Sequence, residues 1–210
     1  MATEVDDTRA RVIEAAGSVF ANKGFEAATV REICQLGKAN LAAVNYYFGD
    51  KRRLYLATVE FAYRHRAEQV PFPGWPQGTD PRKKLADFIL TMLTRMIGRG
   101  PSQWERDLML REVARPTEAC QEMVHDFIRP QFAMLFGILS ELMPTTTAER
   151  IRLVAFSVVG QCLHYRVTDP VIQMLVSPQE YASYDPQRLA EHITELTLGG
   201  IERIVRDQQK

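Results

Sequence analysis

The sequence predicts an all-α protein made of two helical regions. Apolar residues recur at the spacing of an α-helix in most segments, beginning with Val12, Ala16 and Phe20. Residue patterns that cap helix N-termini precede several of these segments. No segment shows a sustained alternation of apolar and polar residues, which would indicate β-strands. At 210 residues, the chain is long enough for one large domain or two smaller ones, each with its own core.

The first two helices are predicted from their ends. Asp6, Asp7 and Thr8 can cap the first helix, which should end near Lys23 and Gly24, because a cation followed by glycine is typical of a helix C-terminus. Thr29 and Glu32 have the spacing of a capping box, in which a hydroxyl and a carboxylate satisfy each other's backbone N–H groups. The second helix must be short, because Gly37 follows within a few residues.

Two further helices complete a module over residues 1–66. Asn40 can cap a helix over residues 40–48, and Asp50 can cap a longer one that continues to about residue 70. Two short helices joined by a tight turn and followed by a longer helix indicate a helix-turn-helix.

The remaining chain is also expected to be helical. Residues 71–80 form a Pro/Gly-rich loop or linker that cannot be helical throughout. Pro130 should kink or break the helix that contains it. Helices are expected over residues 79–98, 102–115, 117–142, 147–167 and 185–207, within a second domain that covers residues 80–210.

The charge distribution is asymmetric although the formal net charge is zero. Residues 8–66 contain ten Lys/Arg against five Asp/Glu, whereas residues 67–210 contain sixteen against eighteen. A basic first third suggests a module that faces phosphates, joined to a region with another task.

Several classes of protein are not indicated. No apolar run is long enough to cross a bilayer and no secretory signal begins the chain, so a cytoplasmic location without a membrane partner is expected. Cys34, Cys120 and Cys162 are far apart and are expected to be buried thiols. His125 and His164 could join Cys162 as metal ligands, but a fourth ligand is missing, so no metal site is predicted. We find no catalytic motif and expect no catalytic residues and no cofactor.

The third predicted helix is the one that would enter the major groove of DNA. Leu41, Val44 and Phe48 share a face that turns partly inward. Asn45 on the outer face can bond adenine, and small apolar side chains can contact thymine methyl groups. Arg31, one helix earlier, is expected to contact a guanine. The residues expected at the DNA are Thr29, Arg31, Leu41, Ala42, Ala43, Asn45, Tyr46, Tyr47 and Lys51.

Phosphate contacts are expected from tyrosine hydroxyls and from Lys51. Lys51, Arg52 and Arg53 place three cations in a first helical turn, where the helix dipole disfavours positive charge. A nearby polyanion explains them, and a solvated face compensated by Asp50 is the alternative. The tyrosines could instead pack in a small core.

Residues 8–66 resemble the DNA-binding domain of the TetR family of bacterial repressors. The resemblance is carried by TVREI at 29–33, NYYF at 45–48 and KRRL at 51–54, and more weakly by REVARPTEA and VVGQCLHYR in the second half. One departure is Lys38, which occupies the place of the family's turn glycine. A lysine at positive φ costs about 1 kcal/mol, unless the turn shifts to use Gly37.

The resemblance implies that the second domain binds a small molecule and dimerises. The effector is unidentified, and an apolar pocket with a few polar groups is the usual form of such a site. The same aromatic and methionine residues could simply form core. The pocket candidates are Trp104, Arg111, His125, Phe127 and His164.

The two last long helices contain small residues, which favour a close approach to another helix. A four-helix interface across a two-fold axis would use them, and packing within one subunit is the alternative. The interface candidates are Ala155, Gly160, Gly199 and Gly200.

The leading hypothesis is a homodimeric repressor that binds a pseudo-palindromic operator in double-stranded DNA and is released by a small-molecule effector. One alternative is a helical enzyme or small-molecule-binding protein with a vestigial DNA-binding domain. Another is an architectural protein that binds DNA without sequence preference.

Overall fold

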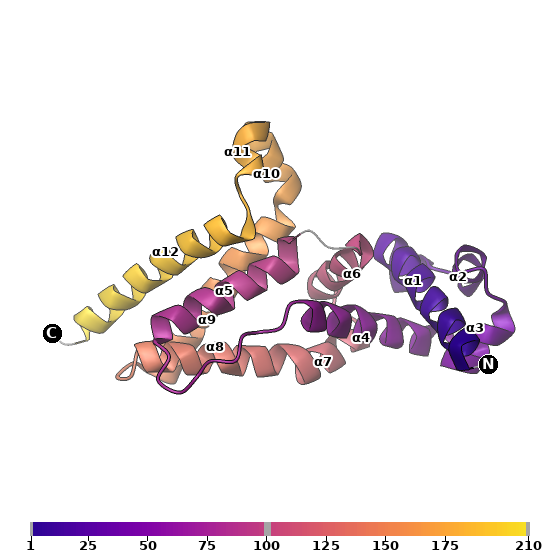
Figure 1. Ribbon diagram of the computed structural model, residues 1–210, viewed down its shortest axis with the longest axis horizontal. Helices are drawn as coiled ribbons and strands as arrows, with labels where there is room; N and C mark the ends of the chain where they lie inside the picture. The colour runs from indigo at the N-terminus through magenta and orange to yellow at the C-terminus, as the bar shows by residue number, and fades with distance from the viewer. Residues whose placement is uncertain (1, 99–101, 209–210) are drawn as a thin grey trace. The chain divides into compact units, whose positions relative to one another are not determined.

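The computed structural model describes the backbone of residues 2–98 and 102–208, and side chains from residue 7 onward. Within these ranges the regular structure consists of α-helices and one π-helix, which confirms the all-α prediction (Figure 1). No helix in the described part is long and apolar enough to cross a membrane.

Close packing divides the chain into two units. Unit 1 combines residues 1–69 with residues 100–128, and unit 2 combines residues 70–99 with residues 129–210. The expected boundary near residue 80 therefore differs from the packing. Residues 102–128 lie beyond that boundary in the sequence but pack on the N-terminal helices. Their apolar residues share a core with α1 (Ala2–Ala27) and α4 (Lys51–Gln69).

The helices of unit 1 agree with the sequence prediction except in α1 and beyond residue 117. Its elements are α1 (Ala2–Ala27), α2 (Val30–Leu36), α3 (Leu41–Phe48), α4 (Lys51–Gln69), α6 (Gln103–Ala114), α7 (Glu118–Met123) and the π-helix η1 (Val124–Ile128). Helix α1 begins before Asp7 and Thr8, so these residues do not cap it. Arg11, on the next turn, forms an ion pair with Asp7 and donates a hydrogen bond to the Thr8 hydroxyl. Gly24 interrupts it with φ +77°, where a C-terminus was expected.

Helix α6 packs closely on α1 in unit 1. A Cβ atom on Gly17 would lie 2.2 Å from Cε3 of Trp104, so the indole occupies the space of the missing side chain. The indole N–H donates to Oε1 of Glu14 over 2.8 Å. The ring also stacks on Phe61 of α4, with centroids 6.3 Å apart. Trp104 therefore joins α6 to both α1 and α4.

Unit 2 is a second helical body with its own core. Its elements are α5 (Pro81–Ile97), α8 (Arg129–Leu142), α9 (Ala148–Val167), α10 (Asp169–Leu175), α11 (Pro178–Ala182) and α12 (Pro186–Asp207). Buried residues of α5 pack against α8, α9 and α12. The Pro/Gly-rich loop lies on α5, where Phe72 stacks on Phe88 at 4.9 Å and Trp75 donates to Asp87 over 3.0 Å.

The break expected at Pro130 is present. The single helix predicted over residues 117–142 is divided into α7, η1 and α8. Proline has no N–H, so it cannot donate an α-helical hydrogen bond to the carbonyl four residues earlier, that of Asp126. A π-helical turn at residues 124–128 precedes it, as is common where the helical hydrogen-bond ladder is interrupted.

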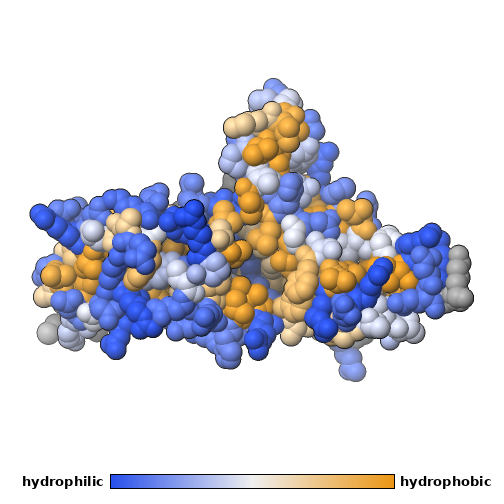
Figure 2. Space-filling view, turned by 180° about the vertical axis from the view of Figure 1, so that it is seen from behind, coloured by the Kyte–Doolittle hydropathy of each residue, from blue (hydrophilic) through white to orange (hydrophobic). Residues whose placement is uncertain are grey.

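Helices α10 and α11, which the sequence pattern did not predict, form a hairpin that projects from unit 2. Its two helices are joined by a hydrogen bond from the Tyr181 hydroxyl to Asp169. Val171, Met174 and Leu175 are exposed on it. Hydrophobic residues are visible on this hairpin at the top of Figure 2.

Candidate nucleic-acid interface

The predicted capping box holds the start of α2. The hydroxyl of Thr29 accepts the Glu32 N–H over 3.2 Å, and Glu32 Oε2 accepts the Thr29 N–H over 3.2 Å. Lys23 bonds the same carboxylate, and this bond is the largest of the interactions that lower the pKa of Glu32. Thr29 thus lies at the surface with its hydroxyl already bonded inside the chain.

Helix α3 is capped at both ends, and the cap at its start is Asn40, as the sequence predicts. Oδ1 of Asn40 accepts the Ala43 N–H over 2.7 Å. Gly49, at φ +83°, ends the helix and donates its N–H to the Asn45 carbonyl over 2.9 Å. Oδ1 of Asp50 then accepts the Arg53 N–H over 2.8 Å at the start of α4. These local bonds determine where α3 begins and ends.

One face of α3 is buried and the other is exposed. Val44 and Phe48 are in the core of unit 1, as expected. Leu41, the first residue of α3, is 57% exposed, which corrects the expectation that it turns partly inward. Tyr46 is 81% exposed, so it does not pack in the core.

The other residues expected at the DNA occupy several environments. Ala42, Asn45 and Arg31 are exposed, whereas Ala43 and Tyr47 are half-buried. Tyr47 makes an edge contact with Tyr46 at 5.1 Å between ring centroids. The exposed surface of α3 is therefore formed by Leu41, Ala42, Asn45 and Tyr46, which we call the α3 face.

The three cations at the start of α4 have separate environments. Nζ of Lys51 donates to the Glu26 carbonyl over 3.1 Å and lies 4.7 Å from the centre of the Phe25 ring. Arg52 forms a bidentate ion pair with Glu118 of α7. These two cations have partners inside unit 1, so their occurrence does not require a polyanion. Arg53 is exposed.

A buried polar network that the sequence pattern did not indicate joins α4 to α6. Glu112 is fully buried, accepts the hydroxyl of Tyr55, and accepts the Thr117 hydroxyl over 2.9 Å. Burial first, and then the bond to Glu112, raises the pKa of Tyr55. Glu105, also buried, lies 2.7 Å from Nδ1 of His65. Gly17, a glycine inside α1, was the signal in the sequence that another helix packs closely there, and that helix is α6.

The five pocket candidates do not line one cavity within either unit. Trp104 belongs to the core of unit 1, and Arg111 donates to the Lys23 carbonyl over 3.2 Å. His125 is exposed and pairs with Asp126 at 2.6 Å. His164 is exposed on α9 of unit 2.

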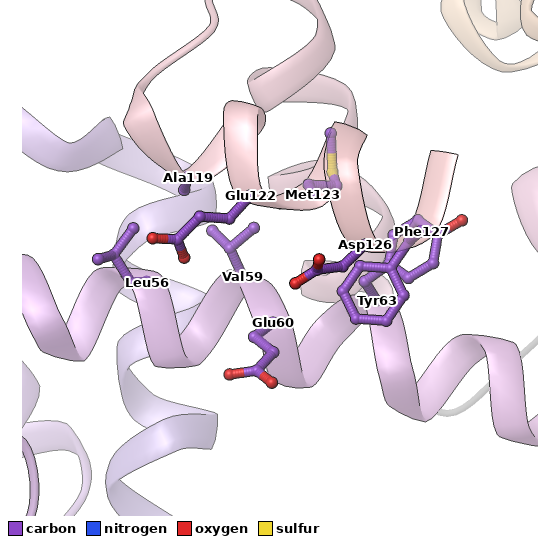
Figure 3. A pocket seen from close by; sticks show the side chains of 9 residues that line it. All are labelled: Leu56, Val59, Glu60, Tyr63, Ala119, Glu122, Met123, Asp126 and Phe127. Carbon is purple, nitrogen blue, oxygen red and sulfur yellow. The ribbon is translucent and has the colours of Figure 1, made fainter. Parts of the chain in front are cut away.

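Phe127 does line a groove in unit 1, between α4 and α7–η1 (Figure 3). It stacks on Tyr63 with centroids 4.4 Å apart. Three carboxylates also line the groove, those of Glu60, Glu122 and Asp126. Their negative charge disfavours a phosphate, so this groove is not part of a nucleic-acid interface. Among the described residues, no cluster of three or more His, Cys, Asp or Glu could hold a metal ion.

The interface candidates in unit 2 separate into two kinds. Ala155 is fully buried in the core of unit 2, so it faces away from any second copy, which corrects its assignment. Gly160, Gly199 and Gly200 are exposed, and a Cβ atom on any of them would meet no atom within 4 Å.

Two family models match the chain. Residues 12–58 match the bacterial regulatory proteins of the tetR family. Residues 81–201, more than half of the chain, match the C-terminal domain of the HTH-type transcriptional dual regulator CecR. The first match contains α2 and α3, and therefore the α3 face.

Curated relatives are similar over a shorter region. The HTH-type transcriptional repressor NicS of Pseudomonas putida is 36% identical over 62 residues, which are 30% of this chain and 29% of NicS. The HTH-type transcriptional repressor AcnR of Corynebacterium efficiens is 34% identical over 68 residues, which are 32% of this chain and 36% of AcnR. The chain therefore matches about a third of the length of these relatives.

Solved structures are similar along most of the chain. A TetR-like transcriptional regulator from Rhodococcus sp. RHA1 aligns with a TM-score of 0.63 and 18% identity, over 93% of this chain and 96% of the other. HlyIIR, a hemolysin II transcriptional regulator, aligns with a TM-score of 0.59 and 17% identity, over 90% and 98% of the two chains. At these identities the similarity shows the fold.

Proposed function

The chain belongs to the TetR family of bacterial regulatory proteins, and we propose that it is a homodimeric repressor that binds a double-stranded DNA operator and releases it when a small-molecule effector binds. As a member of this family it is a transcriptional regulator rather than an enzyme. The proposed location is the cytoplasm, where the operator would be.

The α3 face is the observation that supports DNA recognition. An exposed amide, a tyrosine and two apolar side chains lie on one side of a helix whose other side is buried. Such a helix can insert into a major groove, where Asn45 would bond adenine and Ala42 would contact a thymine methyl group. Capping at both ends keeps the helix in place without DNA.

The dimer is supported by the open side of α9 and α12 in unit 2. Leu153, Phe156 and Gly160 recur at helical spacing on α9, and all are exposed. Leu196 and Gly199 are exposed in the same way on α12. Exposed apolar residues beside glycines that touch nothing fit an isologous interface, in which the same patch of two copies meets. A dimer would place two α3 helices on the half-sites of a pseudo-palindrome.

Release by an effector is supported by the position of α6. This helix lies within the part that matches the C-terminal domain of CecR, yet its buried carboxylates bond α4 of the DNA-binding module. An effector that displaces α6 would have to break or carry along the Glu112–Tyr55 and Glu105–His65 contacts. It can weaken DNA binding only by the difference of its affinities for the two arrangements.

Selection of bound duplexes from a random-sequence library, using the full chain, tests the proposal. Enrichment of a two-fold symmetric sequence is the expected result. Equal binding of a scrambled duplex would favour an architectural protein and contradict operator recognition.

Asn45→Ala tests the aim of α3 on the selected duplex. We expect the preference at one base pair of each half-site to relax by about 1–3 kcal/mol, measured by competition against duplexes substituted at that pair. Lys51→Ala is the comparison, because a phosphate contact contributes equally to all sequences. Unchanged specificity in Asn45→Ala would show that this face does not read bases.

A further inference from the structure

The turn between α2 and α3 contains a backbone conformation that its side chain does not favour. Lys38 has φ +48°, and it is the one non-glycine residue with positive φ in the described part of the chain. The Ala39 N–H donates to the Cys34 carbonyl over 3.0 Å, which completes a Schellman motif at the end of α2. Glycine is the usual residue at this left-handed position, and asparagine is the next most common.

The neighbouring glycine serves another purpose. Gly37 is buried, and a Cβ atom on it would lie 3.1 Å from Cβ of Ala15 and 3.2 Å from the carbonyl oxygens of Arg11 and Ile33. Its φ is −80°, an ordinary value for any residue. Gly37 is therefore needed for the close approach of the turn to α1, and the positive φ is left to Lys38.

No contact in the described part of the chain accounts for a lysine at this position. The side chain is exposed, and within residues 7–98 and 102–208 the ammonium group makes no ion pair or hydrogen bond. Glycine or asparagine would form the same turn with less strain. Residues held in unfavourable backbone conformations concentrate at functional sites.

The position of Lys38 indicates what it contacts. It lies two residues before Asn40, the cap of α3, at the end of the helix whose N-terminal residues approach base edges in helix-turn-helix proteins. Lysine side chains and helix N-termini are among the groups that contact phosphates, and these contacts fix the orientation of a protein on the duplex. We propose that Lys38 binds a DNA phosphate and so positions α3 in the groove, an inference that rests on the proposed recognition of DNA by the α3 face.

Three substitutions separate charge from backbone strain. Lys38→Gly and Lys38→Asn remove the cation and keep a residue that accepts positive φ, whereas Lys38→Arg keeps the cation. Lys83→Ala, on the exposed surface of α5 in unit 2, is the control for removal of one positive charge. Affinity for a fluorescent duplex selected from the library, and for its scrambled version, is measured by anisotropy between about 50 and 200 mM salt.

Lys38→Gly and Lys38→Asn should bind both duplexes about tenfold more weakly. When the logarithm of the binding constant is plotted against the logarithm of the salt concentration, the slope should be shallower by about 0.9 for each phosphate that the protein no longer neutralises. Lys38→Arg and Lys83→Ala should retain the slope. The melting temperature of Lys38→Gly should not fall, which separates weaker binding from weaker folding.

Wild-type affinity and slope in both the Gly and the Asn variants would overturn the role of Lys38. Failure to select any sequence would overturn operator recognition. The salt slopes on a duplex of random sequence would still decide whether Lys38 contacts phosphate.

Discussion

Glycines in the helices of the two units have opposite surroundings. In unit 1, the missing side chain of Gly17 is replaced by the Trp104 ring, which lies 2.2 Å from the position of a Cβ atom. In unit 2, Gly137, Gly160 and Gly199 face nothing within 4 Å. A glycine inside a helix costs up to about 1 kcal/mol relative to alanine. Unit 1 compensates this cost within the chain, whereas unit 2 does not.

The difference favours one surface of unit 2 for contact with a second copy. Gly160 and Gly199 lie on helix faces that also expose large apolar side chains, such as Phe156 and Leu196. Gly137 instead lies on a face of α8 with exposed Ala133 and Glu141, which is typical of a surface in contact with solvent. The comparison therefore supports α9 and α12, and not α8, as the surface that meets a second copy.

The largest effect is expected from Gly17→Ala. Its Cβ atom would overlap the Trp104 ring, and we expect a decrease of about 2–3 kcal/mol in the free energy of unfolding, measured by calorimetry and denaturant titration. The same substitution in a Trp104→Leu background should cost much less, because the two residues are in direct contact. An equal cost in both backgrounds would show that the indole is not what excludes a side chain at position 17.

Association should be weakened next most strongly by Gly199→Leu. We expect the dissociation constant of the dimer to rise about 30-fold, equivalent to about 2 kcal/mol, because a bulky side chain holds the facing helices apart. Sedimentation velocity over a concentration series measures it.

Gly137→Leu is the matched control for this measurement, since position 137 is equally open in the single chain. Association should be unchanged in this variant. If Gly137→Leu dissociates the dimer and Gly199→Leu does not, the interface uses α8 and the assignment to α9 and α12 is wrong.

The smallest effect is expected from Gly137→Ala. The added methyl group meets no atom, so only the gain in helix propensity remains, and the free energy of unfolding should rise by up to about 1 kcal/mol. The melting temperature of the full chain measures this gain. A decrease would mean that this face of α8 is covered in the assembled protein.

The helix-turn-helix could be predicted because its determinants are local. Thr29, Asn40 and Asp50 each cap the helix that follows them in the structure, through bonds to residues three positions away. Such contacts depend on short-range spacing and are therefore visible in the sequence. The position of Lys38 at a turn that favours glycine was visible for the same reason.

Long-range contacts could not be predicted in this way. Nothing near Glu112 in the sequence indicates that it bonds Tyr55, 57 positions earlier. The environment of Ala155 depends on which side of α9 faces the core of unit 2. Small residues fit both a core and an interface, so composition alone does not distinguish them.

The sequence by itself determined that the chain is helical, where α3 begins and ends, and which face of it carries Asn45, because caps and apolar periodicity act over a few residues. Tertiary structure decided that α6 packs with the DNA-binding module, that Lys51 and Arg52 are bonded inside it, and that Lys38 rather than Gly37 takes the left-handed conformation. Close packing accompanies the last outcome, since a Cβ atom on Gly37 would lie 3.1 Å from Cβ of Ala15 and would require its neighbours to shift by a few tenths of an ångström.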